Sequence, residues 1–210
     1  MPTNFPTSVD NFTNPTANDS LNLPSHSTQH ANANDAIEAV EDYLLNGGQG
    51  LTFINKTSFS SVVSVSLPTD TFTTTYDNYR IVFNFTAGST NYFYGRMRAA
   101  GTDDSSGSYG SALGFGIFTT AAWGNDASAS ETNTSFIRFG FAEADVSQVV
   151  DVCSPKLARK TTYSGTGARK NVLTIHAGFF NATTSFDSMT FTALTGTISG
   201  DIRVYGYRNS

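Results

Sequence analysis

From residue 51 to the C-terminus, hydrophobic and polar residues alternate with a period of two, which predicts β-strands. In residues 79–85, Ile81, Phe83 and Phe85 share one face and alternate with polar neighbours. The same pattern predicts strands over 92–99, 137–141, 173–179 and 198–207, and shorter ones over 51–54, 62–67, 113–118, 149–152 and 189–193. Segments rich in Gly, Ser and Asp separate them, among them 101–110 and 164–167.

About ten short strands with no helical pattern between them predict an antiparallel β-sandwich or jelly-roll-like domain over residues 51–210. In the strand expected over 173–179, Leu173, Ile175, Ala177 and Phe179 should face the core, with His176 on the outer face. The predicted outer faces carry Tyr and Arg more than Lys and Glu, which is typical of an interface.

Before residue 50 the period becomes helical, and a short helix is predicted over 35–45 with Asn34 or Asp35 as its N-cap. Its hydrophobic seam consists of Ala33, Ile37, Val40 and Leu44. A helix this short is marginal in isolation, so the seam needs a surface, either its own β-domain or copies of itself on a threefold axis. The segment 35–50 is thus interpreted as a helix and Gly-rich linker, and as a possible trimer bundle.

Residues 1–34 have no hydrophobic period and contain four of the six prolines. Such a segment cannot build its own core, so it is either disordered or an extended arm that lies along a partner. Its isolated apolar side chains would then be the anchoring contacts, namely Phe5, Phe12, Leu21 and Leu23.

Composition narrows the class of protein further. Only 14% of the 210 residues are charged, the net charge is -5, and there are 17 Phe and 9 Tyr residues. This excludes a coiled-coil rod, a disordered acidic tail and a helical bundle, and it argues against a phosphate-backbone binder. The single cysteine, Cys153, excludes an internal disulfide. With no signal-peptide pattern and no long apolar run, we expect synthesis as a soluble protein in a cytoplasm, without membrane insertion.

Few residues suggest chemistry. His26 and His30 would share a face if the helix began early, as two metal ligands or as six in a trimer, although polar residues in a lead-in segment are the plainer interpretation. The pair Asp103-Asp104 could bind calcium, but its loop lacks EF-hand spacing and a solvated turn is favoured. No phosphate loop, nucleophile elbow, dinucleotide motif or carboxylate pair is recognisable, so we expect no enzyme and no cofactor.

Two surface features remain open. Five of the twelve basic residues lie between Lys156 and Lys170, and this run is a nucleic-acid site, a solvated loop, or a site that meets an acidic surface such as a neighbouring subunit's arm. Trp123 is the single tryptophan. Burial at the end of the sandwich is favoured for it, whereas an exposed Trp123 with Tyr109 nearby would stack on a sugar ring.

The N-terminal run FPTSVDNFTNPTANDSLNLPSHSTQHANANDAIEAVEDYL resembles a segment that recurs in bacteriophage virion proteins of the tail-fibre and minor tail type. The phrases YDNYRIVFNF, RMRAAGTDD and GTISGDIRVYGYR resemble the β-domain of such proteins more loosely. The resemblance implies a homotrimer that attaches to other virion proteins through its N-terminal arm and helix, with the β-domain pointing outward. It departs from long fibres, since no shaft repeats separate the helix from the β-domain.

Three functions follow as hypotheses. A receptor-binding fibre or spike predicts an exposed aromatic groove around Tyr109, Trp123 and Tyr163 that binds host surface glycan. A capsid decoration or head fibre predicts an arm at a capsomer junction and loops without a ligand. A polysaccharide-degrading spike predicts a carboxylate pair in a cleft.

Overall fold

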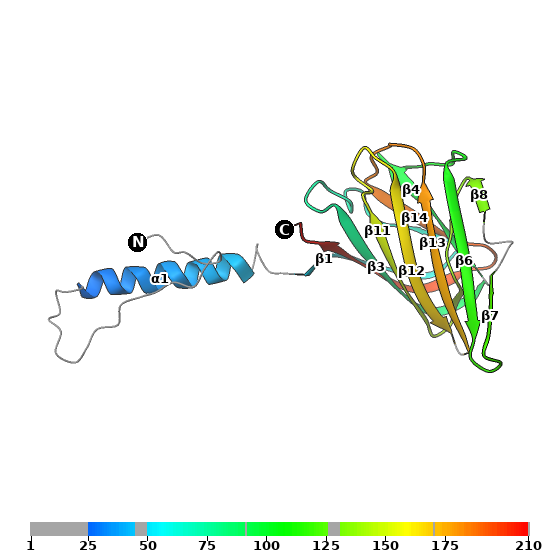
Figure 1. Cartoon of the computed structure of the whole chain (residues 1–210), viewed down its shortest axis with the longest axis horizontal. Coiled ribbons are helices and arrows are strands. Elements are labelled where there is room, and N and C mark those ends of the chain that lie inside the picture. Colours follow the sequence, from blue (N-terminus) through cyan, green and yellow to red (C-terminus); the bar gives the residue numbers. More distant parts are fainter. Residues whose placement is uncertain (1–24, 45–49, 91, 126–130, 170, 210) are drawn as a thin grey trace. The chain divides into compact units, whose positions relative to one another are not determined.

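The computed structural model describes residues 25–44, 50–90, 92–125, 131–169 and 171–209 (Figure 1). The chain divides into two compact units, residues 1–50 and residues 51–210. The first contains the helix α1 (His26–Asp42), and the second contains all fifteen strands of the described residues. The anchoring residues proposed above, Phe5, Phe12, Leu21 and Leu23, lie outside the described residues.

The helix α1 begins about nine residues earlier than the sequence pattern suggested, so the prediction that it starts at residue 35 is wrong. Ser25 is the N-cap, and its hydroxyl accepts a hydrogen bond of 3.3 Å from the amide of Thr28. Asn34 and Asp35 therefore lie inside the helix, and residues 26–34 are helical rather than extended. No side chain of α1 is buried.

The larger of two antiparallel sheets has ten strands, eight of which form a continuous path (Figure 1). In order along the sheet these are β1 (Leu51–Val62), β15 (Ile198–Tyr207), β3 (Asn78–Thr90), β11 (Val146–Cys153), β12 (Thr161–Arg169), β13 (Val172–Phe180), β6 (Tyr109–Ile117) and β7 (Ala122–Asn125). Two short strands pair off this path, β10 (Ala142–Glu143) with β3 and β8 (Glu131–Thr134) with β6.

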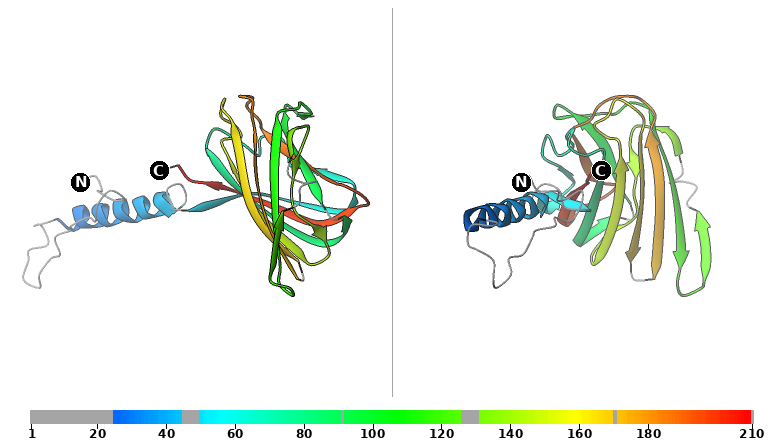
Figure 2. Two further views of the ribbon diagram at one scale, coloured as in Figure 1. Left: turned by 45° about the vertical axis from the view of Figure 1, so that its right-hand side comes forward. Right: turned by 60° about the vertical axis from the view of Figure 1, so that its left-hand side comes forward.

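The smaller sheet has five strands and completes the sandwich (Figure 2). Its order is β2 (Ser64–Ser66), β14 (Ser188–Ala193), β4 (Phe93–Ala99) and β5 (Thr102–Asp103), with β9 (Ile137–Arg138) also paired to β4. The predicted fold class, a mainly β antiparallel sandwich preceded by one N-terminal helix, is therefore confirmed.

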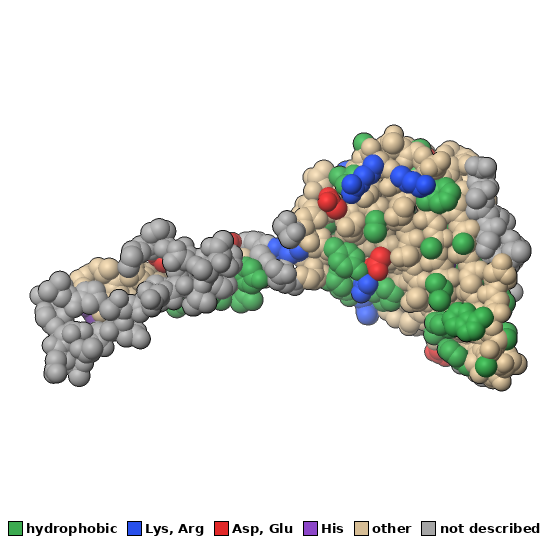
Figure 3. All heavy atoms as spheres, in the orientation of Figure 1, with side chains coloured by type: hydrophobic (Ala, Val, Ile, Leu, Met, Phe, Trp, Pro, Cys, Tyr) green, Lys and Arg blue, Asp and Glu red, His purple; other side chains and the backbone are tan. Residues whose placement is uncertain are grey.

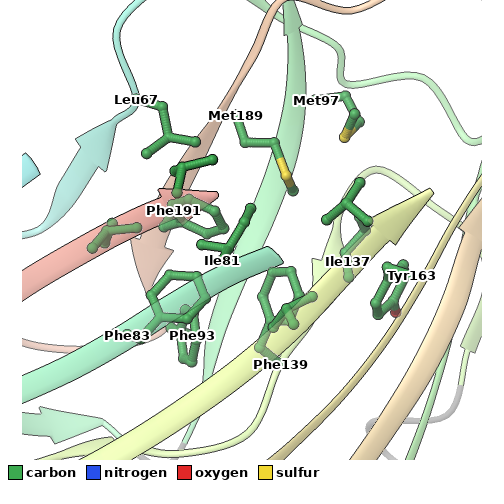
Figure 4. Close-up of a cluster of buried hydrophobic side chains, with 14 of the residues drawn as sticks. Leu67, Ile81, Phe83, Phe93, Met97, Ile137, Phe139, Tyr163, Met189 and Phe191 are labelled. Atoms are coloured by element: carbon green, nitrogen blue, oxygen red, sulfur yellow. The ribbon is translucent and has the colours of Figure 1, made fainter. Parts of the chain in front are cut away.

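Aromatic side chains from both sheets meet in one core (Figure 4). Phe83 of β3 contacts Phe93 of β4 and Phe191 of β14, with ring centroids 5.1 and 4.8 Å apart. Phe139, which follows β9, stacks on Phe93 at 5.1 Å. These edge-to-face and offset contacts are the favoured arrangements of aromatic rings, and they hold the two sheets together. The predicted inward face of 79–85 is the one that is buried.

The sequence pattern did not identify β12, because its residues 164–167 were interpreted as a break. Its two inward glycines, Gly165 and Gly167, are in fact regular strand positions opposite His176 and Thr174. A side chain at either glycine would collide with atoms of the neighbouring strands. The glycines therefore make room for large neighbours rather than ending the strand.

Candidate functional site

The first candidate site is a seam formed by five residues of α1 and by Leu44, which lies two residues beyond the end of the helix. Its members are His26, His30, Ala33, Ile37, Val40 and Leu44. Successive members are separated by four, three, four, three and four residues, which is the spacing of a heptad a/d seam. Ile37, Val40 and Leu44 are 57, 41 and 70% exposed. The earlier start of α1 thus extends the four-residue seam predicted from sequence by two histidines.

The two histidines of the seam converge on each other. Their Nε2 atoms are hydrogen-bonded to each other at 3.3 Å, and the rings meet edge to face with centroids 4.4 Å apart. This geometry follows from the i,i+4 spacing, which places both side chains on one face of a helix. The sequence predicted that the two histidines would share a face if the helix began before residue 35, and this alternative is the one that the structure shows.

The second candidate site is the outer face of the larger sheet around β6, β7 and β13. Contrary to prediction, Ile175 and Ala177 face outward and are exposed, while Thr174 and His176 face inward and are buried. The phase of the strand is set by Phe180, which packs on Tyr109 and Phe186 in the core. Because side chains alternate, every second residue before Phe180 then points inward.

Trp123 lies at the β7 end of this outer face and is 68% exposed, so the favoured expectation that it is buried is wrong. It lines a shallow apolar depression of about 220 Å³ together with Leu173, Phe118 and Gly116. Figure 3 shows hydrophobic side chains gathered over this end of the sheet. The depression has the apolar floor and exposed indole that stacking on a sugar ring or packing on a protein surface requires.

The other two residues of the predicted aromatic groove are elsewhere. Tyr109 and Tyr163 are 0 and 3% exposed, so neither can contact a receptor, and that prediction is wrong for both. Tyr109 faces inward, and its hydroxyl accepts a 3.1 Å hydrogen bond from the amide of Met97 and donates one of 3.0 Å to the carbonyl of Asp104. Burial raises the pKa of each phenol well above its usual range.

A polar cluster lies on the same sheet's outer face, at β15, β3 and β11. Arg80, Asp151 and Tyr207 form it, and Arg80 and Asp151 also line a second shallow depression of about 280 Å³ with Val149, Ile175 and Ala177. Burial raises the pKa of Tyr207 to about 12, assisted by its hydrogen bond to Asp151. Sequence reasoning noted the Tyr and Arg residues of the outer faces but could not bring these three together.

His176 is buried beneath the sheet, where it contacts the ring of Phe139 edge to face with centroids 5.5 Å apart. Within the described part of the chain, neither ring nitrogen has a hydrogen-bond partner. Burial lowers the pKa of His176 to about 4, so the imidazole is neutral near pH 7. The expectation that His176 lies on the outer face is wrong.

The basic run does not form one patch. Lys156, Arg159 and Lys160 precede β12 and Arg169 ends it, so a nine-residue strand of roughly 27 Å separates the two groups. Lys160 lies over the ring of Phe179 at 4.1 Å, and Arg169 pairs with Glu143 and lies over Phe141. These contacts tie Lys160 and Arg169 to neighbouring side chains of the sandwich.

Asp103 is part of the fold rather than of a cation loop. It pairs with Arg98 at 3.0 Å and accepts a 2.7 Å hydrogen bond from the hydroxyl of Thr190. Asp104 accepts a 2.8 Å hydrogen bond from the amide of Ser106, as a turn residue does. Among the described residues, no group of three or more His, Cys, Asp or Glu side chains could hold a metal within a single chain.

None of the helices among the described residues is long and apolar enough to cross a membrane. Comparison with known proteins found no family model, no curated protein and no solved structure that matches the chain. The geometry of the two candidate sites therefore carries the functional argument, together with the resemblance of the N-terminal segment.

Proposed function

We propose that this protein is a structural component of a bacteriophage virion, a short trimeric tail fibre or spike. Its N-terminal segment would attach it to other virion proteins, and its β-sandwich would recognise the host surface. The observation that carries the proposal is the exposed seam of α1, a helix with no buried side chain in a unit separate from the sandwich. The resemblance of the N-terminal segment to phage virion proteins supplies the context.

The physical argument for oligomerisation begins with helix stability. Most helical stability in proteins comes from packing of an apolar face, and α1 has 17 residues of which none is buried, so covering its seam would stabilise it. Covering it with copies of itself buries Ile37, Val40 and Leu44 together, at about 25 cal/mol for each Å² of apolar surface. The 4,3 spacing brings the same residues to the axis in each copy.

The identity of the seam residues favours three chains over two. The spacing places Ile37 and Leu44 at a positions and Val40 at a d position. Parallel dimers prefer Leu at d, whereas a β-branched residue at d shifts the preference towards trimers and larger bundles. Val40 therefore supports the homotrimer.

Host recognition is supported by the outer sheet face. Trp123 is exposed and forms a depression with Leu173 and Phe118. This end of the outer face is therefore more apolar than a sheet face that only meets solvent needs to be. Aromatic side chains of this kind stack on the apolar faces of sugar rings. We therefore assign host surface glycan as the ligand class of this end of the sandwich.

The oligomer is tested by native mass spectrometry of the full-length protein. We expect a species of three times the chain mass of 22.5 kDa. Ala33→Asp, which places a charge in the seam, should give single chains, whereas Ala31→Asp should remain trimeric. Both alanines are exposed helical residues, and Ala31 lies on the opposite side of α1 from the seam. A wild-type protein that stays a single chain at micromolar concentration overturns the trimer.

The virion assignment is tested by immunogold electron microscopy of phage particles with an antibody against the sandwich. Label at the tail tip or baseplate is the expected result. Label over the head surface would replace the fibre with a capsid decoration, and particles without label would overturn the virion assignment itself.

A further inference from the structure

We propose that His26 and His30 form a binding site for one divalent first-row transition-metal ion per three chains, on the axis of the α1 bundle. The inference rests on the trimer proposed above, because the partner copies supply the ligands that one chain lacks. It assigns a role to the two polar residues of an otherwise apolar seam.

The distance between the two imidazoles supports a shared ion. Their Nε2 atoms are 3.3 Å apart without any change of the helix. For metal–nitrogen bonds of about 2.0–2.1 Å, two ligands of one ion lie about 3.3–3.4 Å apart in tetrahedral geometry and about 2.8–3.0 Å apart as neighbours in octahedral geometry. The present separation therefore matches two ligands of a tetrahedral ion, and a shift of a few tenths of an ångström brings it to the octahedral value. A bound ion would replace the hydrogen bond between the two rings.

The register supplies the remaining ligands. His26 continues the d positions of Ala33 and Val40, and His30 continues the a positions of Ile37 and Leu44. In a parallel trimer, residues at a and d point at the axis, so three copies of each histidine occupy two successive layers. Up to six imidazoles then surround one point, where a single chain offers two.

The chemistry of the donors selects the class of ion. Imidazole is a ligand for Zn²⁺, Ni²⁺, Co²⁺ and Cu²⁺, while Ca²⁺ and Mg²⁺ require oxygen ligands. The first turn of α1 contains no acidic residue. The hydroxyl of Ser25 is the N-cap of α1, since it accepts a hydrogen bond from the amide of Thr28.

An ion also accounts for polar residues at core positions. Two consecutive polar layers weaken a coiled-coil seam unless their groups find partners. Coordination satisfies the imidazole nitrogens and links the three chains at one end of the bundle. The ion would thereby stabilise the helix that the proposed function uses for assembly.

The test uses the full-length protein, stripped of metal with EDTA and then supplied with Zn²⁺ or Co²⁺. Native mass spectrometry reads the number of chains and the number of ions in each particle, and visible absorption of Co²⁺ reports imidazole ligation. We expect one ion per trimer. His30→Ala should weaken Co²⁺ binding more than about 100-fold, beyond the loss seen when only an outer-shell partner is removed.

A matched control moves the imidazole without changing composition. The double variant His30→Ala with Ala31→His keeps the helix but turns the side chain away from His26 and from the seam. It should lose the ion while remaining a trimer. Full retention of binding in this variant would show that the seam histidines are not the ligands and would overturn the site.

The outcomes separate the two proposals. A wild-type trimer that takes up no ion overturns the metal site and leaves the trimer standing. A wild-type single chain, with or without an ion, overturns the trimer and with it the shared site. A trimer that binds one ion through both histidines supports both.

Discussion

Arg80 and Asp151 lie directly opposite each other on β3 and β11, and two parallel hydrogen bonds of 2.8 Å join the guanidinium to the carboxylate. The hydroxyl of Tyr207 on β15 donates a third, of 2.7 Å, to the same carboxylate. The guanidinium carbon of Arg80 also lies 5.5 Å from the centre of the Tyr207 ring. One outer-face cluster therefore links three neighbouring strands.

Asp151→Asn should lower the free energy of unfolding by about 1 kcal/mol at pH 7, since it removes the charge from a bidentate pair that remains partly exposed. Burial opposes ionisation of Asp151, but the hydrogen bonds from Arg80 and Tyr207 outweigh it and lower its pKa. The stabilisation is thus complete above about pH 4, the unfolded pKa, and is lost as pH falls through the folded pKa. Urea unfolding at several pH values measures both effects.

Asp70→Asn is the control for this experiment, because it also removes one carboxylate, at an exposed turn residue with φ of 58° that Asn tolerates. It should change stability by less than about 0.5 kcal/mol. An Asp151→Asn protein as stable as the wild type at neutral pH would show that the cluster contributes nothing to folding.

Stability should fall by about 2 kcal/mol between about pH 7 and about pH 5 because of His176. Burial lowers its folded pKa to about 4, below the ordinary value near 6.5, so the unfolded chain binds the proton first. Stability is therefore lost as pH falls from 6.5 towards 4. In His176→Leu the denaturant midpoint of unfolding should depend much less on pH over this range, since the substitution removes the buried titrating group.

The other two histidines lie in α1, outside the sandwich unit, and serve as an internal control. Replacing His26 with Gln should leave the pH dependence of sandwich unfolding unchanged. A His176→Leu protein that keeps the wild-type slope would place the titration elsewhere.

Gly165→Ala should destabilise the sandwich by about 1–3 kcal/mol. A Cβ there would collide with the carbonyl oxygen of Val149 and the ring of His176. Gly114→Ala is the matched control on β6, because its Cβ would meet only carbonyl oxygens at 3.7 and 4.0 Å. Chemical denaturation of the two variants checks the difference, and equal stabilities would contradict the close packing of β12 on β13.

Trp123→Ala should change the stability of the sandwich by less than about 1 kcal/mol but abolish binding to host surface glycan. Because Trp123 is the single tryptophan, the tryptophan fluorescence of the protein comes from this residue alone. Acrylamide should quench it readily, since the indole is exposed. Adding glycan extracted from host cells should protect it from the quencher.

Phe53→Ala removes another exposed aromatic ring, on β1, and should leave glycan binding intact. Undiminished binding by the Trp123→Ala protein, with no protection of the wild-type indole, would remove this end of the sheet from the proposed recognition site.

Sequence periodicity located most strands because their inward residues, such as Phe83, Phe93 and Ile202, are large and apolar. It failed on β13, where both faces carry apolar residues and the choice between Phe179 and Phe180 decides the phase. It also failed on β12, whose glycines resemble a turn until His176 is seen opposite Gly165. The local pattern of apolar and polar residues does not show which strand lies next to a given strand.

The candidate site was predictable in part. The seam from Ala33 to Leu44 follows from spacing alone, and the position of the histidines follows once Ser25 is recognised as the N-cap. The exposure of Trp123 and the burial of Tyr109 depend on which side of β6 and β7 faces the smaller sheet. An aromatic residue near Gly and Ser is equally compatible with either side.

By itself, then, the amino-acid sequence determined the mainly β class, the helical segment before it and the seam along that helix. All three depend on the order of apolar and polar residues within about ten positions, which is the range over which backbone periodicity acts. The tertiary structure alone decided which face of β13 is inside, which aromatic residues reach solvent, and that Arg80 meets Asp151. These depend on strand pairing across as many as 71 residues of chain, a separation at which no local pattern carries information.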